Sequence, residues 1–98
     1  MKNLKEIKEI LKSSKEEIRK QFKAEIIGIF GSYIRGEQKR GSDLDLLVKF
    51  YEGATLFEFI DLANFLEKKL GIKKVDIVPY DTIREEIKEK ILKETIYL

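Results

Sequence analysis

Apolar positions along the chain follow two spacings, and these predict an order of helices and strands. Over residues 3–22 they recur every three, four or seven positions, the spacing of an amphipathic helix. Three runs, 25–30, 43–50 and 73–78, are instead short and apolar, with Gly, Pro or polar residues around them, as strands are. Strands that alternate with helices indicate an α/β layer fold.

Thr55 and Glu58 have the spacing of a capping box, in which each side chain accepts a hydrogen bond from the other residue's backbone. The box predicts a helix that ends at Leu70, before the stop signal Gly71. We expect its apolar stripe to face the core rather than a partner protein. The stripe consists of Leu56, Phe59, Ile60, Ala63, Leu66 and Leu70, widened by Leu62 and Phe65.

The C-terminal part carries a similar signal. Thr82 and Glu85 suggest a second capping box and a helix to about Lys93. The apolar tail 95–98 predicts a short last strand. Together these elements make a single domain over residues 1–98.

Two strands carry acids on one face only. Even-numbered positions of the run 43–50 are apolar and should pack on helices, whereas Asp43 and Asp45 fall on the opposite face. Asp76 repeats this pattern on the strand 73–78. We therefore expect an acidic cleft where these strands begin. In the first strand, Gly28 predicts close approach of another backbone or of a ligand.

Gly31 and Ser32 lie where the first strand ends and a short helix is expected to begin. The unpaired N–H groups of a helix start favour an anion. The segment from Gly31 to Asp45, GSYIRGEQKRGSDLD, thus offers a turn for an anion and two carboxylates for a cation. A nucleoside triphosphate with its magnesium presents both.

Gly31–Ser32, followed after ten residues by Asp43–Asp45, resembles the signature of the DNA polymerase beta-like nucleotidyltransferases. With Arg35–Gly36 and Ser42, the string resembles the minimal nucleotidyltransferases (MNT proteins), the antitoxin half of HEPN/MNT toxin–antitoxin pairs. Asp76 matches the third acid of that family. The resemblance implies the nucleotidyltransferase fold, a small mixed β-sheet with helices packed on one face.

The resemblance also implies residue roles. Asp43, Asp45 and Asp76 would be catalytic and would bind two magnesium or manganese ions, which clamp the attacking and leaving oxygens of a phosphoryl displacement. The residues that would bind the nucleotide are Gly31, Ser32, Arg35, Arg40 and Ser42. A structural salt bridge remains an alternative for Arg35, and a mobile loop charge for Arg40.

The implied activity is transfer of AMP from ATP to a hydroxyl, a tyrosine of a partner HEPN toxin, which silences the toxin. Two alternatives stay open. One is a non-catalytic antitoxin that neutralises by binding, and the other is a nucleotidyltransferase acting on a small molecule such as an aminoglycoside.

Composition narrows the chemistry. The 98 residues include no His and no Cys, which removes thiol nucleophiles, His bases and the usual zinc ligands. Carboxylate oxygens remain, and they suit magnesium or manganese. The net charge of +2 lacks the basic excess of a nucleic-acid binder. No apolar run is long enough to cross a membrane and the N-terminus is too charged for a signal peptide, so a cytoplasmic protein is expected.

Overall fold

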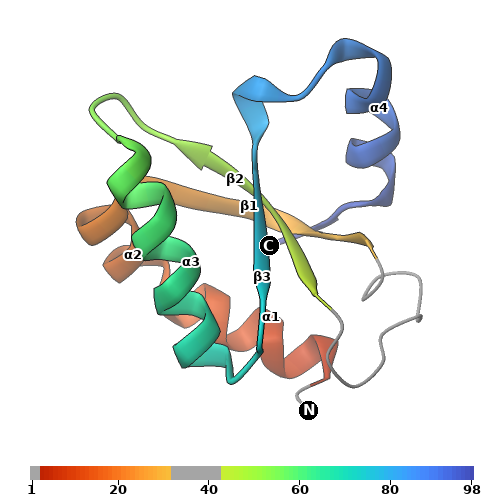
Figure 1. Ribbon diagram of the computed structural model, residues 1–98. Helices are drawn as coiled ribbons and strands as arrows, with labels where there is room; N and C mark the ends of the chain where they lie inside the picture. The colour runs from red at the N-terminus through yellow and green to blue at the C-terminus, as the bar shows by residue number, and fades with distance from the viewer. Residues whose placement is uncertain (1–2, 32–42) are drawn as a thin grey trace.

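The computed structural model describes residues 3–31 and 43–98, which form a mixed four-stranded sheet with helices α1, α2 and α3 on one face (Figure 1). The strand order is β3-β2-β1-β4, with β2 and β3 parallel and the other pairs antiparallel. In chain order the elements are α1 (Leu4–Ser13), α2 (Lys15–Phe22), β1 (Ala24–Phe30), β2 (Leu44–Phe50), α3 (Leu56–Leu70), β3 (Val75–Pro79), the 3-10 helix η2 (Tyr80–Thr82), α4 (Glu85–Glu94) and β4 (Ile96–Tyr97). This is the expected α/β fold, including the short last strand. None of the helices in the described ranges is both long and apolar enough to cross a membrane.

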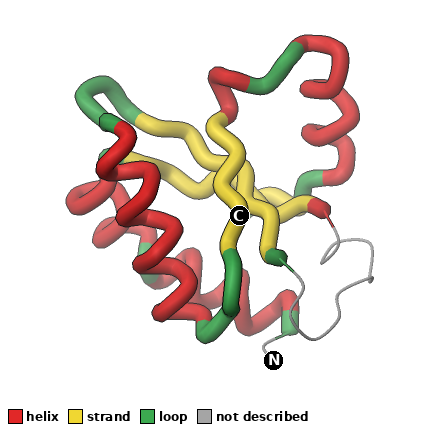
Figure 2. Tube along the Cα trace, viewed as in Figure 1, coloured by secondary structure: helices red, strands yellow, loops and turns green. Residues whose placement is uncertain are grey.

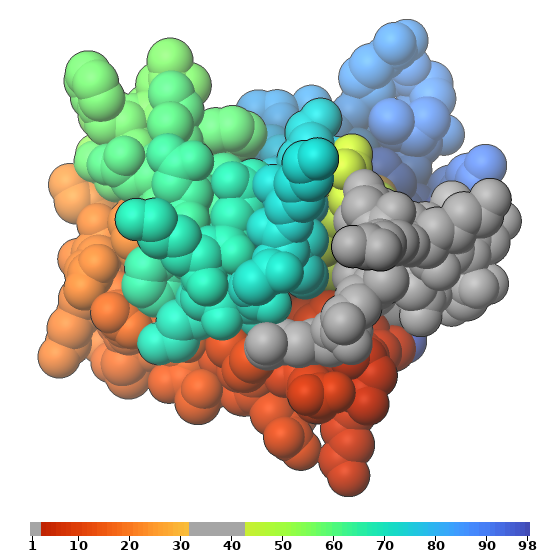
Figure 3. Space-filling model, turned by 60° about the horizontal axis from the view of Figure 1, so that its bottom comes forward, coloured from red at the N-terminus to blue at the C-terminus, as the bar shows by residue number. Residues whose placement is uncertain are grey.

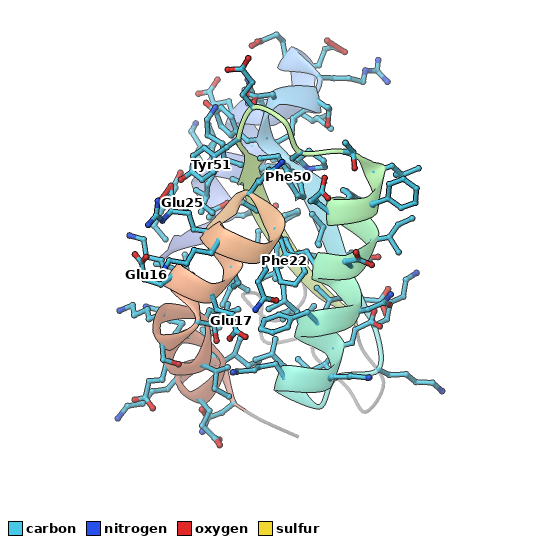
Figure 4. All side chains as sticks on the ribbon, turned by 90° about the vertical axis from the view of Figure 1, so that its left-hand side faces the viewer. Glu16, Glu17, Phe22, Glu25, Phe50 and Tyr51 are labelled. Atoms are coloured by element: carbon cyan, nitrogen blue, oxygen red, sulfur yellow. The ribbon has the colours of Figure 1, made fainter. Side chains whose placement is uncertain are left out.

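A single core lies between the three helices and the sheet. Each helix contributes buried side chains at helical spacing, and the strands contribute the residues of one face. On α2, Phe22 reaches toward α3, where its ring centroid is 5.1 Å from that of Phe65 (Figure 4). Helix α4 stands apart from this layer and has no buried residue (Figure 2).

The predicted helix over residues 3–22 is in fact two helices that meet at Ser14. The backbone of Ser14 leaves the helical region, with φ −95° and ψ 3°. Asn3 caps the first helix with a complete capping box to Glu6. Ser14 is buried in the stripe between Leu11 and Ile18, a position that the apolar spacing alone did not include.

Helix α3 begins and ends as predicted, but it presents a different face to the core. The Thr55–Glu58 capping box is formed, and Gly71 ends the helix in the left-handed conformation. The buried residues are Leu62, Leu66 and Leu70. The prediction that Leu56 and Ile60 face the core is wrong: both side chains are exposed, because the buried stripe follows Leu62, Leu66 and Leu70 and leaves Leu56 and Ile60 at its edge.

The predicted capping box between Thr82 and Glu85 does not form, although the helix predicted after it, α4, does. The Thr82 hydroxyl donates instead to the Pro79 carbonyl, 3.0 Å away, which closes η2. Arg84 therefore becomes the N-cap of α4, without a side-chain cap bond. The Thr82 hydroxyl bonds to the nearby Pro79 carbonyl and so does not cap α4.

A β-bulge in β1 sets which residues face the start of β2. Ile26 pairs with Val48 but Gly28 pairs with Leu47, so that one extra residue is accommodated. Without it, Ile29 would lie opposite Asp45; with it, Phe30 does. The predicted close approach at Gly28 is confirmed: a Cβ there would lie 2.5 Å from the Ile96 carbonyl oxygen.

We predict that Ser14→Ala stabilises the protein by about 1 kcal/mol, since a buried hydroxyl without a hydrogen bond costs about 1–3 kcal/mol. The Ser14 side chain is 2% exposed, and its Oγ has no hydrogen-bond partner. Urea unfolding measures the change in the free energy of unfolding. The control is Ser13→Ala, whose exposed hydroxyl donates to the Ile10 carbonyl and whose loss should change stability by less than about 0.5 kcal/mol. A loss of stability in Ser14→Ala would contradict the prediction.

Candidate active site

The parallel pairing of β2 with β3 brings two of the predicted acids side by side. Asp45 is the register partner of Asp76, and the residues before them, Leu44 and Val75, are also partners. Leu44 and Val75 are buried beneath the helices. Because side chains alternate along a strand, Asp45 and Asp76 lie on the other face, on strands about 4.8 Å apart. The predicted placement of the acids on that face is confirmed.

Asp43 joins this pair through Lys74, a residue that the sequence prediction missed. The Lys74 ammonium lies 3.8 Å from Asp43 Oδ2 and 3.7 Å from Asp76 Oδ1. All three side chains are 39–61% exposed, so these ion pairs contribute little to stability. The two ion pairs instead show that the site accommodates a positive charge between the carboxylates of Asp43 and Asp76. The signal was present in the sequence, since Lys74 and Asp76 share a strand face at i and i+2.

The pKa of Asp76 is raised above its ordinary value. Partial burial is the main cause, followed by a hydrogen bond with the Asp43 carboxyl, whereas the Lys74 ammonium lowers the pKa. Asp43 and Asp76 are therefore close enough to disfavour simultaneous ionisation. A site of this kind is stabilised by added positive charge.

Gly31 lies directly against the Asp45 carboxylate. It follows β1 with φ +85°, and a Cβ at this position would overlap Asp45 Oδ2 and lie 2.9 Å from Cγ. Only glycine combines this conformation with this contact. The sequence motif predicts that Gly31 binds the nucleotide, and this stays a prediction; in the structure Gly31 lies against the Asp45 carboxylate.

The donor chemistry of the site fits magnesium. Asp43, Asp45 and Asp76 supply carboxylate oxygens, the ligands that magnesium and manganese prefer, and Asp43 and Asp76 already share the Lys74 ammonium. Within residues 3–31 and 43–98, no set of three acidic side chains is already arranged to hold a metal ion. Asp43, Asp45 and Asp76 are the residues that would hold a metal ion here.

The other predicted nucleotide-binding residues, Ser32, Arg35, Arg40 and Ser42, lie outside the described residues.

A basic and aromatic cluster occupies the far end of the same sheet face. Lys49 forms an ion pair with Asp81 at 3.4 Å, and its ammonium lies 5.9 Å from the Tyr80 ring centroid. Lys88 of α4 lies over the same ring at 4.5 Å. Four residues along the strands separate this cluster from the acids, roughly 13 Å. It ties α4 to the sheet and was not anticipated from the sequence.

Comparison with known proteins places the chain among nucleotidyltransferases. The family described as "Nucleotidyltransferase domain" matches residues 4–98. The protein adenylyltransferase MntA of Thermococcus cleftensis is 43% identical over 98 residues, which cover 100% of this chain and 98% of that protein. A proposed protein adenylyltransferase of Methanocaldococcus jannaschii is 43% identical over 99 residues, covering 100% of each chain.

Solved structures share the fold. A proposed minimal nucleotidyltransferase superimposes with a TM-score of 0.81 at 35% identity, covering 99% of this chain and 97% of that chain. A crystal structure of a toxin–antitoxin with AMP-PNP shows the same fold, with a TM-score of 0.66 at 24% identity over 84% of this chain and 67% of that chain. The nucleotidyltransferase fold implied by the sequence motifs is thus confirmed.

We predict that Asp76→Asn makes the metal-free protein more stable at neutral pH. A carboxyl whose pKa is raised on folding weakens the folded state once pH rises above the unfolded value, near 3.8, and the amide removes that penalty. Solvent screening keeps the gain below about 1 kcal/mol. The gain should disappear below the ordinary Asp pKa, where both states bind the proton. Thermal unfolding with a chelator, across pH 3 to 8, measures it.

The control is Asp81→Asn, which removes an exposed carboxylate that is paired with Lys49, and no gain at neutral pH is expected from it. An Asp76→Asn variant less stable than its parent at neutral pH would show that Lys74 outweighs burial and Asp43.

We predict that Gly31→Ala destabilises the protein by more than the roughly 1–2 kcal/mol cost of a left-handed non-glycine residue, because it also displaces the Asp45 carboxylate. Truncating that carboxylate by Asp45→Ala should relieve part of the cost, so the two changes should be less than additive in urea unfolding. Gly53→Ala is the matched control, with φ +93° and only the flexible Lys23 amine near its Cβ. Strict additivity of Gly31→Ala with Asp45→Ala would refute the contact.

Proposed function

Because this chain belongs to the nucleotidyltransferase family and has MntA-type protein adenylyltransferases among its relatives, we propose that it transfers AMP from ATP to a hydroxyl of a partner protein. In this proposal the acceptor is a tyrosine of a HEPN toxin, and its modification silences the toxin. The observation that carries the proposal is the in-register pair Asp45–Asp76, with Gly31 and Asp43 beside it. The activity belongs in the cytoplasm, where ATP is available.

The proposed reaction is an in-line displacement at the α-phosphate. The acceptor oxygen forms a bond to the α-phosphorus, the bond to the β-phosphate oxygen breaks, and pyrophosphate leaves. Asp43 and Asp45 would hold two magnesium ions, which neutralise charge on the attacking and leaving oxygens. Asp76 would hold the magnesium ion nearer the acceptor hydroxyl and would accept the proton of that hydroxyl.

The remaining nucleotide contacts are proposed from the sequence motif. Ser32 and the backbone N–H groups after Gly31 would bind the β- and γ-phosphates, and Ser42 would support them. Arg35 and Arg40 would neutralise phosphate charge.

The described residues form one small domain, and this size favours a protein acceptor. Nearly all of the described chain is used to build one sheet and its helix layer, which leaves no separate substrate domain. A protein acceptor that brings its own hydroxyl is better matched to such a unit than a small molecule, which needs an enclosed site.

We predict that the double variant Asp43→Asn/Asp45→Asn folds normally but loses transfer. The amides keep the volume and leave Leu44 and Leu46 buried, but they are poor magnesium ligands. Loss of several kcal/mol of charge stabilisation corresponds to a roughly thousandfold lower rate. The measurement is intact-mass spectrometry of the co-expressed HEPN partner, which should carry one or more added AMP groups only with the parent protein.

The control is Glu89→Gln, which removes an exposed acid of α4 that lies outside the site and should leave transfer unchanged. The comparison also separates catalysis from simple binding. A folded double variant that protects cells from the toxin at substoichiometric levels, with no mass added to the toxin, would move the protein to the binding class.

A further inference from the structure

Three large apolar side chains at the start of α3 stand in solvent. Leu56 is 70% exposed, Phe57 75% and Ile60 48%, and together we call them the α3 patch. Side chains this apolar and this exposed, adjacent on one helix, are unusual in a small globular domain unless they bind something. The patch lies at a corner of the molecule, where the green start of α3 projects in Figure 3.

A pocket lies next to the projecting side chains of the α3 patch. Its volume is about 340 Å³, and it opens between α3, the end of β2 and η2. Its apolar lining includes Phe50, Leu56, Phe59 and Pro79. Leu56 belongs to both features, so an apolar side chain seated in the pocket would also contact the patch. This is the geometry of an anchor pocket at the centre of a protein interface.

The charge around the patch selects the occupant. Residues 50–67 contain four acids and no Lys or Arg, in a chain with 20 Lys and Arg among 98 residues. Three lysines reach this end from other elements, and each has a partner: Lys23 donates to the Gly53 carbonyl, Lys49 pairs with Asp81, and Lys88, which lies over the Tyr80 ring, pairs with Glu85. The exposed acids Glu52 and Asp61 therefore give the patch a negative rim.

A second copy of the chain is a poor occupant for this surface. In a two-fold dimer the same patch meets itself, so the acidic rims would face each other and repel. A partner surface with apolar side chains flanked by Lys or Arg would match both the apolar patch and its acidic rim.

The patch is separate from the acids of the active site. It follows the end of β2, whereas Asp43 and Asp45 lie at the beginning of that strand, roughly 20 Å away along its seven residues. In Figure 3 the cyan β3 lies between the green start of α3 and the yellow-green start of β2. A molecule bound at the patch would leave the carboxylates accessible.

We propose that the α3 patch and its pocket are a docking site for a basic amphipathic helix of a partner protein, distinct from the catalytic site. Where the proposed function holds, that partner is the acceptor protein, and this identification alone rests on it. Docking at a distance would supply affinity for the acceptor without occupying the site where AMP is transferred.

The test uses two short helical peptides, one of leucine and lysine and one of leucine and glutamate, titrated into the ¹⁵N-labelled chain. The leucine–lysine peptide should shift amide signals of residues 51–61 and 80–82, and should bind at least tenfold more tightly than the leucine–glutamate peptide. Leu56→Ser/Phe57→Ser and Glu52→Lys/Asp61→Lys should each weaken binding at least tenfold. Matched controls elsewhere are Ile87→Ser, exposed by 48%, and Glu9→Lys/Glu89→Lys; they should bind as the parent does.

Three results would overturn the proposal: absence of binding, equal binding of both peptides, or shifts that centre on another surface. So would signal broadening that grows with protein concentration and is abolished by Leu56→Ser/Phe57→Ser, since it would make the patch a contact between copies.

A kinetic measurement tests the identity of the partner. Leu56→Ser/Phe57→Ser should raise the KM for the HEPN acceptor at least tenfold and leave kcat unchanged. If no AMP transfer occurs at all, the proposed function fails, while the peptide titration still decides the docking site. An unchanged KM with intact transfer would instead reject the acceptor as the docked partner.

Discussion

The backbone pairing between β2 and β3 determines both the core and the site. Leu44 beside Val75 fills the space under the helices, and the next pair, Asp45 and Asp76, is then forced onto the opposite face. Slipping either strand by one residue would exchange the two faces, burying carboxylates and exposing leucine. Two hydrogen bonds fix the start of β3: Leu44 N–H donates to the Lys74 carbonyl, and Val75 N–H donates to Glu67 of α3. Helix α3 thereby helps to place the acids.

Much of this arrangement could be predicted because it depends on local rules. A strand shows its two faces directly in the alternation of residue types, so the acid face of β2 and β3 followed from the sequence. The capping box of α3 and its Gly71 stop are equally local, since the groups that bond to each other are three or four residues apart. The site acids followed from the same patterns combined with a family motif, and their catalytic roles remain proposals.

The features that could not be predicted depend on contacts between distant segments. The break at Ser14 reflects how two helices fit onto one sheet, and the apolar spacing continues across it. Leu56 and Ile60 match the apolar stripe of α3, but the helix packs on the sheet through Leu62, Leu66 and Leu70, and this choice of face leaves Leu56 and Ile60 exposed. Lys74 shares a strand face with Asp76 in the sequence, but its contact with Asp43 depends on the pairing of β2 with β3. Thr82 had two available partners, and the choice depended on the turn after Pro79.

The bulge in β1 has a consequence for how chains of this kind can vary in length. The extra residue between Ile26 and Gly28 is absorbed locally, and the pairing of Phe30 with Asp45 beyond it is regular. An insertion or deletion of one residue at the bulge would change the number of residues between α2 and Gly31 while leaving Gly31 against Asp45. A change of one residue after Gly28 would instead rotate the end of β1 to the wrong face. The number of residues upstream of the bulge can therefore change, whereas the four residues from Gly28 to Gly31 must keep their number for Gly31 to stay against the Asp45 carboxylate.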